Sequence, residues 1–137
     1  MSWWKRIFGS GRPKTDFVYI RLPARIEPIE RGERFEDPLT EMMTARGLGE
    51  ITGGGSSLSD PDDEGRRFVV EAGIDLEVTD LAVARPELRT ALKALGAPPG
   101  TTVEFTSPQS EPLQDRWSGQ AWALDESRLD RHPAFGL

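Results

Sequence analysis

Cysteine is absent from this chain of 137 residues, and only one histidine and one tyrosine occur. Without cysteine there can be no disulfide, no thiolate nucleophile and no zinc site built from cysteine. No apolar run approaches the ~20 residues that a helix needs to span a bilayer. The start of the chain has its bulky residues first and lacks the apolar core of a secretory signal. We therefore expect a cytoplasmic protein.

Charge is unevenly distributed along the chain. Hydrophobic residues make up 36% and charged residues 29%, which is typical of a folded soluble protein with one core. The net charge is −6, but residues 1–14 carry four cations and no acid, so residues 15–137 carry −10. A body this acidic repels a phosphate backbone. We therefore expect no nucleic-acid partner.

Six local patterns follow one another as strand, helix, strand, strand, helix and strand. The predicted strands are Phe17–Leu22, Leu48–Thr52, Phe68–Thr79 and Thr101–Thr106, and the predicted helices are Pro38–Arg46 and Pro86–Leu95. The strands alternate apolar and polar side chains, and the helices repeat apolar ones at helical spacing. Each helix is expected to open at its proline, with Asp37 as the cap of the first, and to end before a glycine.

This order of elements resembles that of ferredoxin-like domains across residues 15–106. The resemblance implies an α+β fold, a ferredoxin-like βαββαβ sandwich. Its four-stranded antiparallel sheet has the order 4-1-3-2, with two helices on one face. The stretches Gly47–Gly55 and Gly73–Asp80 look like those of small uncharacterised bacterial proteins with this arrangement. No activity is attached to that family, so the resemblance assigns no catalytic residue. Residues 1–14 are a basic aromatic arm, and 107–137 a C-terminal extension expected to pack on the domain.

Acidic side chains gather on the sheet face that the predicted helices leave uncovered. We expect this face to display Tyr19, Arg21, Glu71, Asp75, Glu77 and Glu104. A concentrated negative patch steers basic partners and raises their association rates. The sequence therefore favours a non-enzymatic binding or regulatory module for a basic protein surface, with self-association as the other possibility. Inhibitors of basic nucleases, including bacterial immunity proteins, are similar to this chain in charge and size.

Three successive glycines, Gly53, Gly54 and Gly55, precede two serines and are included in the expected binding surface. They could form a backbone nest for an anion such as phosphate or carboxylate. They could equally mark a bulged or sharply twisted strand end with another segment packed against it. The segment is not a Walker loop, because no Gly-Lys-Ser/Thr follows. The bulged strand is the favoured interpretation, since glycine clusters alone are weak motifs.

Residues with the chemistry of catalysis are few. His132 has no recognisable triad spacing around it, and the acids of Ser59–Gly65 lack the spacing of an EF-hand loop. We therefore predict no catalytic residue, no metal and no cofactor. The alternative is a carboxylate- or metal-dependent hydrolase that combines the sheet carboxylates with His132 or a divalent ion.

The basic arm combines cations with large apolar side chains, namely Trp3, Trp4, Ile7 and Phe8. We expect Ser2–Phe8 to form a short amphipathic helix that docks on the acidic body, on a second copy or on a membrane surface. Docking on protein is favoured, because burial of Trp and Phe can contribute a few kcal/mol and the opposite charges assist. The alternative is a membrane-peripheral protein anchored weakly by this arm.

Overall fold

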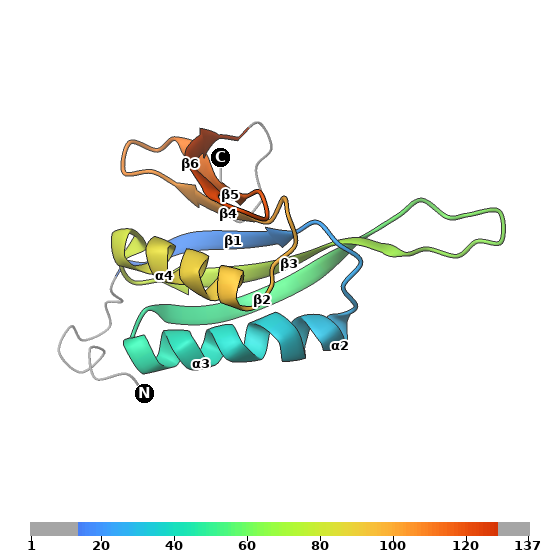
Figure 1. Cartoon of the computed structure of the whole chain (residues 1–137), viewed down its shortest axis with the longest axis horizontal. Helices are drawn as coiled ribbons and strands as arrows, with labels where there is room; N and C mark the ends of the chain where they lie inside the picture. The colour runs from blue at the N-terminus through green and yellow to red at the C-terminus, as the bar shows by residue number, and fades with distance from the viewer. Residues whose placement is uncertain (1–13, 129–137) are drawn as a thin grey trace.

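Six strands and two helical segments make up the part of the chain that the computed structural model describes, residues 14–128. The strands are β1 (Asp16–Leu22), β2 (Gly49–Leu58), β3 (Val69–Val78), β4 (Thr102–Thr106), β5 (Pro112–Trp117) and β6 (Trp122–Ser127). The helical elements are α2 (Pro28–Arg31), the π-helical η1 (Gly32–Glu36), α3 (Asp37–Arg46) and α4 (Leu81–Ala94). All strands pair antiparallel in one sheet of order β2-β3-β1-β4-β5-β6 (Figure 1). The protein is therefore of the α+β class.

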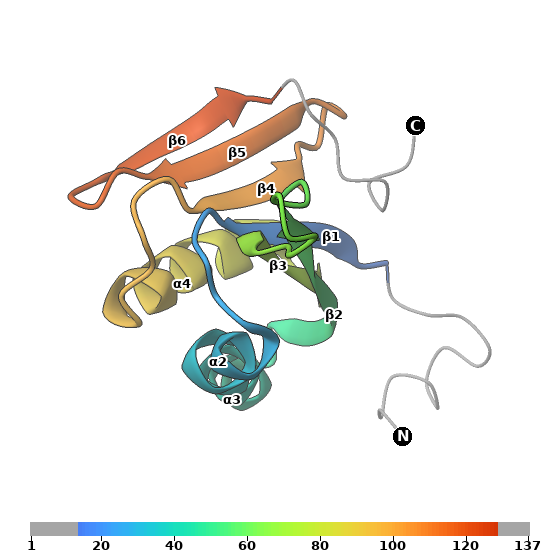
Figure 2. The same ribbon diagram turned by 90° about the vertical axis from the view of Figure 1, so that its right-hand side faces the viewer.

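Both helical segments cover the same face of the sheet (Figure 2). Alternate side chains of β1 and β3 point to this face and are fully buried in one apolar cluster. Leu39 and Met43 of α3 and Leu88 and Leu92 of α4 are buried in the same cluster. The apolar residues that repeat with strand and helix periodicity in the sequence therefore pack together in a single core.

The prediction of a four-stranded sheet is wrong, because the sheet has six strands. The four predicted strands do lie in the predicted order, as β2-β3-β1-β4. Beyond them, the chain turns at Ser107, whose N–H donates to the Glu111 carbonyl at 2.9 Å, and returns as β5 along the edge of β4. Pairing with β5 satisfies backbone groups that β4 would otherwise leave unpaired, and β6 in turn pairs with the other edge of β5.

The first helical segment begins ten residues earlier than predicted, at Pro28 instead of Pro38. Asp37 has helical backbone angles and is not the N-cap of the helix, and Pro38 lies inside the segment. The Asp37 N–H donates to the Gly32 carbonyl five residues back, which is the wider turn of a π-helix. This turn accommodates a proline that has no N–H for a regular helical bond. The segment ends at Gly47, which has a φ of 63°.

The second helix, α4, also begins earlier than predicted. Asp80 caps it by accepting hydrogen bonds from the backbone N–H groups of Ala82 at 3.1 Å and Val83 at 3.3 Å. Pro86 therefore lies inside α4 and does not open it. An aspartate directly before a helical repeat is a start signal as good as proline.

The β5–β6 hairpin is attached to α4 by a buried carboxylate. Asp115 of β5 is fully buried and accepts from Arg85 Nε at 3.0 Å, Arg85 Nη2 at 2.6 Å and Arg89 Nη1 at 2.9 Å. The Arg85 guanidinium also lies over the Phe105 ring, with Cζ 4.0 Å from the centroid. Trp117 is buried in the core and contacts Trp122, with 5.3 Å between ring centroids.

Some predicted features lie outside residues 14–128, namely the arm residues Trp3, Trp4, Ile7 and Phe8 and the candidate base His132. Within the described residues, no helix has the length and apolar character needed to cross a membrane.

Candidate functional site: an acidic sheet face

The face opposite the helices carries the charged residues that the strand alternation predicts. The strand register places Tyr19 of β1 between Asp75 of β3 and Glu104 of β4. Arg21 follows two residues later on the same face of β1. The structure therefore brings the predicted acids, Tyr19 and Arg21 together on three neighbouring strands.

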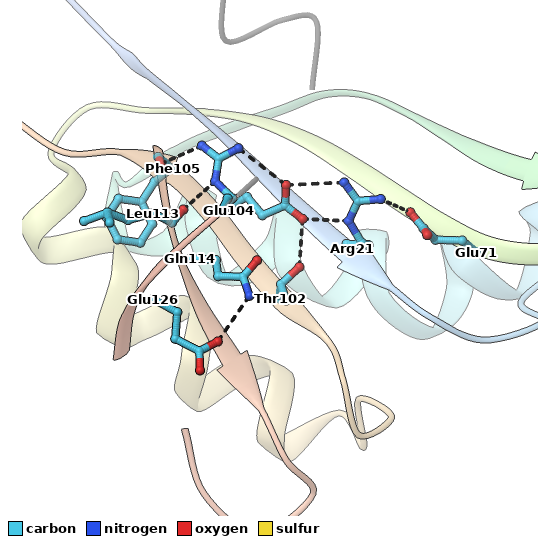
Figure 3. A network of polar contacts seen from close by, with 9 residues as sticks. Arg21, Glu71, Thr102, Glu104, Phe105, Leu113, Gln114 and Glu126 are labelled. Carbon is cyan, nitrogen blue, oxygen red and sulfur yellow. Dashed lines mark hydrogen bonds and ion pairs between the residues drawn. The ribbon is translucent and has the colours of Figure 1, made fainter. Parts of the chain in front are cut away.

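Arg21 neutralises two of these acids (Figure 3). Its Nε donates to Glu104 Oε2 at 2.7 Å, and its Nη1 pairs with Glu71 Oε1. The hydrogen bond to Glu104 raises the pKa of Arg21 above its ordinary value, although partial burial acts in the opposite direction. Arg21 therefore remains charged. Its one positive charge, together with that of Arg128, which also approaches Glu104, balances the two carboxylates.

Glu104 is buried, so it is not displayed to a partner as predicted. It is only 2% exposed, and Arg128 approaches it from the other side, with 3.7 Å between Nη1 and Oε1. Thr102 Oγ1 also donates to Glu104 Oε2 at 2.9 Å. Arg128 in turn donates to the carbonyls of Leu113 at 2.7 Å and Phe105 at 2.8 Å. Strand alternation assigns Glu104 to the correct face, but it cannot reveal a covering arginine distant in sequence.

Tyr19 lies across a glycine of the neighbouring strand. A Cβ atom added to the buried Gly73 of β3 would come within 1.8 Å of Tyr19 Oη, so only glycine leaves room for the ring. Arg21 Cζ lies 5.3 Å from the centroid of the same ring. Burial raises the pKa of Tyr19, Arg21 acts in the opposite direction, and the surrounding carboxylates raise it further. The Tyr19 hydroxyl therefore stays protonated at neutral pH.

Acidic side chains of β2 and β3 lie together at one end of the face. Glu50 of β2 and Glu77 of β3 are directly paired in the strand register, and Asp75 is paired with Gly53. Glu77 Oε2 accepts from Thr15 Oγ1 at 2.9 Å. Within residues 14–128, neither Glu50 nor Glu77 forms an ion pair with a cation. We call Glu50, Asp75 and Glu77 the acidic end.

Glu50 could not be placed correctly from the sequence. Period-two alternation in the predicted strand Leu48–Thr52 puts Glu50 on the same face as Leu48, which is buried in the core. The observed strand begins at Gly49, whose φ is 141°, and Glu50 lies instead on the face of its cross-strand partner Glu77. Directly opposed like charges on neighbouring strands destabilise a sheet, on a scale of about 0.2–1 kcal/mol per pair. The repulsion between Glu50 and Glu77 therefore lowers the stability of the free protein, and no cation within residues 14–128 forms an ion pair with either carboxylate.

The three glycines form part of β2, with a shift in strand register between Ile51 and Gly53. None of Gly53, Gly54 and Gly55 has a positive φ, whereas an anion nest needs a left-handed residue. Arg31 of α2 packs beneath them and donates from Nη1 to the Gly55 carbonyl at 2.8 Å. A Cβ on Gly54 would lie 3.4 Å from the Arg31 Cζ. The geometry thus matches an irregular strand with another segment packed against it.

Clustered metal ligands are missing from the described part of the chain. No group of three or more His, Asp or Glu side chains within residues 14–128 is arranged to hold a metal ion. A shallow depression lies over α2 and η1, away from the sheet carboxylates, and is lined by Glu27, Ile29, Glu30, Glu33 and Arg34. Arg34 is paired there with Glu30 at 3.3 Å. The depression contains no nucleophile paired with a base.

Comparisons with protein-family models, curated proteins and solved structures found no match to this chain. The resemblance to ferredoxin-like domains and to small uncharacterised bacterial proteins therefore stays a prediction.

Proposed function

We propose that this protein is a non-enzymatic module that binds a basic segment of another protein at the acidic end. The observation that carries the proposal is the pairing of Glu50 with Glu77 across β2 and β3 without a cation from the described residues. Such a pair costs stability in the free protein. A lysine or arginine from a partner would remove that cost and gain charge-assisted hydrogen bonds.

The surroundings of the acidic end favour a cationic partner over a neutral one. Glu71 and Glu104 are already paired with Arg21, so the carboxylates proposed to pair with the partner are Glu50 and Glu77. The acidic body adds a long-range field, since residues 15–137 carry −10. A field of this sign accelerates the approach of a basic protein and weakens as salt is added. An inhibitor or immunity-type role, in which the module covers a basic surface, fits this chemistry.

We also propose that residues 15–106 are a ferredoxin-like unit to which β5 and β6 are added. The strand order β2-β3-β1-β4 and the connection of its strands by two helical segments on one face support this assignment. The fold alone carries no function, because it hosts many unrelated ones.

The alternative of a carboxylate- or metal-dependent hydrolase has no comparable support. The depression over α2 and η1 lies on the helical side, whereas the sheet carboxylates lie on the opposite face. The membrane-peripheral alternative depends on the arm, which is outside the described residues.

A pull-down from a host lysate tests the proposal. Glu50→Gln/Glu77→Gln should lose a partner that the wild type retains at low salt and releases at moderate salt. The matched control is Glu41→Gln/Glu111→Gln, which removes two exposed carboxylates elsewhere and gives the same net charge. The control should retain the partner. Equal losses in the two variants would show a general charge effect and contradict a localised site.

A further inference from the structure

An arginine on the open face of the sheet is bound by two carboxylates and an aromatic ring together. Arg21 pairs with Glu71 of β3 through Nη1 and with Glu104 of β4 through Nε (Figure 3). Its Cζ also lies 5.3 Å from the centroid of the Tyr19 ring, two residues earlier on β1. A guanidinium suits such a group because it is planar, donates from several nitrogens in a fixed geometry and is attracted to the face of an aromatic ring.

The same combination occurs on the helical side of the sheet. Arg85 of α4 pairs through Nη2 with Asp115 at 2.6 Å and with Asp125 at 3.1 Å. Its Cζ lies 4.0 Å from the centroid of the Phe105 ring. Two carboxylates beside an aromatic ring are therefore an arrangement that binds arginine on both faces of this sheet.

A further group of this composition lies at the acidic end. The strand register pairs Glu77 of β3 with Glu50 of β2 on one side and with Phe17 of β1 on the other. Directly paired residues point to the same face, so the two carboxylates and the ring form a row across three strands. No arginine within residues 14–128 forms an ion pair with Glu50 or Glu77. The row has the composition of an arginine site without an arginine from the described residues.

This row can be reached from the edge of the sheet. Strand β2 is the terminal strand, Glu50 is exposed, and Glu77 and Phe17 are half-buried. A partner segment that passes along this edge can therefore bring one long side chain onto the row without entering a pocket.

We propose that the acidic end selects an arginine of the partner's basic segment over a lysine. The guanidinium donates to the Glu50 and Glu77 carboxylates together, with its plane against the Phe17 ring. Lysine offers the same charge on a compact, strongly hydrated ammonium that has no flat face for the ring. The preference rests on the proposed function, since it concerns the same site.

Nuclear magnetic resonance titrations of the ¹⁵N-labelled full chain test this preference. Two peptides of equal length and charge are compared, one with arginine and one with lysine at every basic position. The arginine peptide should bind about threefold more tightly or better, judged from the amide shifts of Glu50 and Glu77, because a cation–ring contact at an exposed site alone has this magnitude.

Three variants test the part played by the ring. Phe17→Leu keeps an apolar side chain but removes the ring, so the two peptides should bind it with nearly equal Kd. Phe17→Tyr keeps the ring and should keep the preference for arginine. Phe68→Leu is the matched control, because Phe68 is 38% exposed but lies in the connection before β3, away from the acidic end, and it should also keep the preference.

Equal Kd values for the two peptides in the wild type, with shifts still centred on Glu50 and Glu77, would overturn the selection of arginine and leave the proposed function intact. Binding of neither peptide would refute both. An unchanged preference in Phe17→Leu would show that the ring takes no part and would overturn the arrangement. The wild-type comparison needs no variant, so the test does not depend on the folding of Phe17→Leu.

The other occupant to be distinguished is the basic arm of the same chain. Arg12→Gln removes the arginine nearest in sequence to Thr15, which donates to Glu77. This variant should leave both Kd values unchanged. Tighter binding of both peptides would assign the row to Arg12 and would overturn its assignment to a partner.

Discussion

Replacing Asp115 by alanine should detach the β5–β6 hairpin from α4. The carboxylate is fully buried, whereas the side chains of its partners Arg85 and Arg89 are each 19% exposed. It also accepts the Asp125 N–H at 3.1 Å, so it joins β6 as well as β5 to the helix. Without it, two arginines remain largely buried and lose their main acceptor.

The expected loss of unfolding free energy follows from this burial. Removing one partner of a buried ion pair typically costs about 3–5 kcal/mol, because the other charge stays desolvated. Both guanidinium groups still reach water, and Arg85 keeps a contact to Asp125 at 3.1 Å. We therefore expect the unfolding free energy to fall by about 3 kcal/mol, the lower end of this range. For a chain of this size, such a loss lowers the Tm by roughly 10 °C.

Urea unfolding followed by tryptophan fluorescence measures this effect, because Trp117 and Trp122 lie on the affected hairpin. Hydrogen exchange should show faster opening of the β5 and β6 amides than of the β3 amides. The control is Glu87→Gln, which breaks the exposed pair with Arg46 and should change stability by no more than about 0.5 kcal/mol. If Asp115→Ala lowers the unfolding free energy no more than Glu87→Gln does, the hairpin is not attached to α4 through the Asp115 carboxylate.

Three further predictions concern the sheet face and the arm. Tyr19 is the only tyrosine, so an ultraviolet titration should give a pKa above the ordinary value of about 10. Because folding raises the pKa of Tyr19, the stability that its protonated hydroxyl contributes is complete below about pH 10 and is lost as the pH rises through the folded pKa. A Tyr19→Phe variant whose stability falls as steeply as that of the wild type over this pH range would contradict this. Gly73→Ala should cost about 1–3 kcal/mol in chemical denaturation, because the new methyl group displaces the Tyr19 ring, whereas Gly55→Ala should be nearly neutral. Deleting residues 1–8 should lower the Tm or shift the oligomeric state; loss of binding to anionic vesicles alone would favour the membrane alternative, and no change at all would refute docking.

The order of the first four strands could be predicted from sequence, but β5 could not. Leu113, Asp115 and Trp117 point to the helical side of the sheet, so the middle inward position of β5 is an aspartate. A buried acid interrupts the apolar alternation by which strands are recognised. Its compensating arginines lie on α4, and no local pattern connects them with β5.

The predicted start of each helix was wrong because it was placed at a proline. Pro38 and Pro86 suit the first helical turn, but the π-turn before Pro38 and the Asp80 cap before α4 place both inside helices. On the sheet face, alternation identified the correct side for every predicted acid. It could not separate the acids paired with arginine from Glu50 and Glu77, because ion pairs across strands depend on register and not on local sequence.

The central claim is that the acidic end binds a basic segment. Its most direct test is a nuclear magnetic resonance titration of the ¹⁵N-labelled protein with a peptide rich in lysine and arginine. The account predicts that amide shifts cluster at Glu50, Asp75 and Glu77 and diminish with added salt. Glu50→Gln/Glu77→Gln should weaken binding several-fold more than Glu41→Gln/Glu111→Gln. Shifts centred on the acidic loop Ser59–Gly65, or spread evenly over all exposed acids, would contradict it.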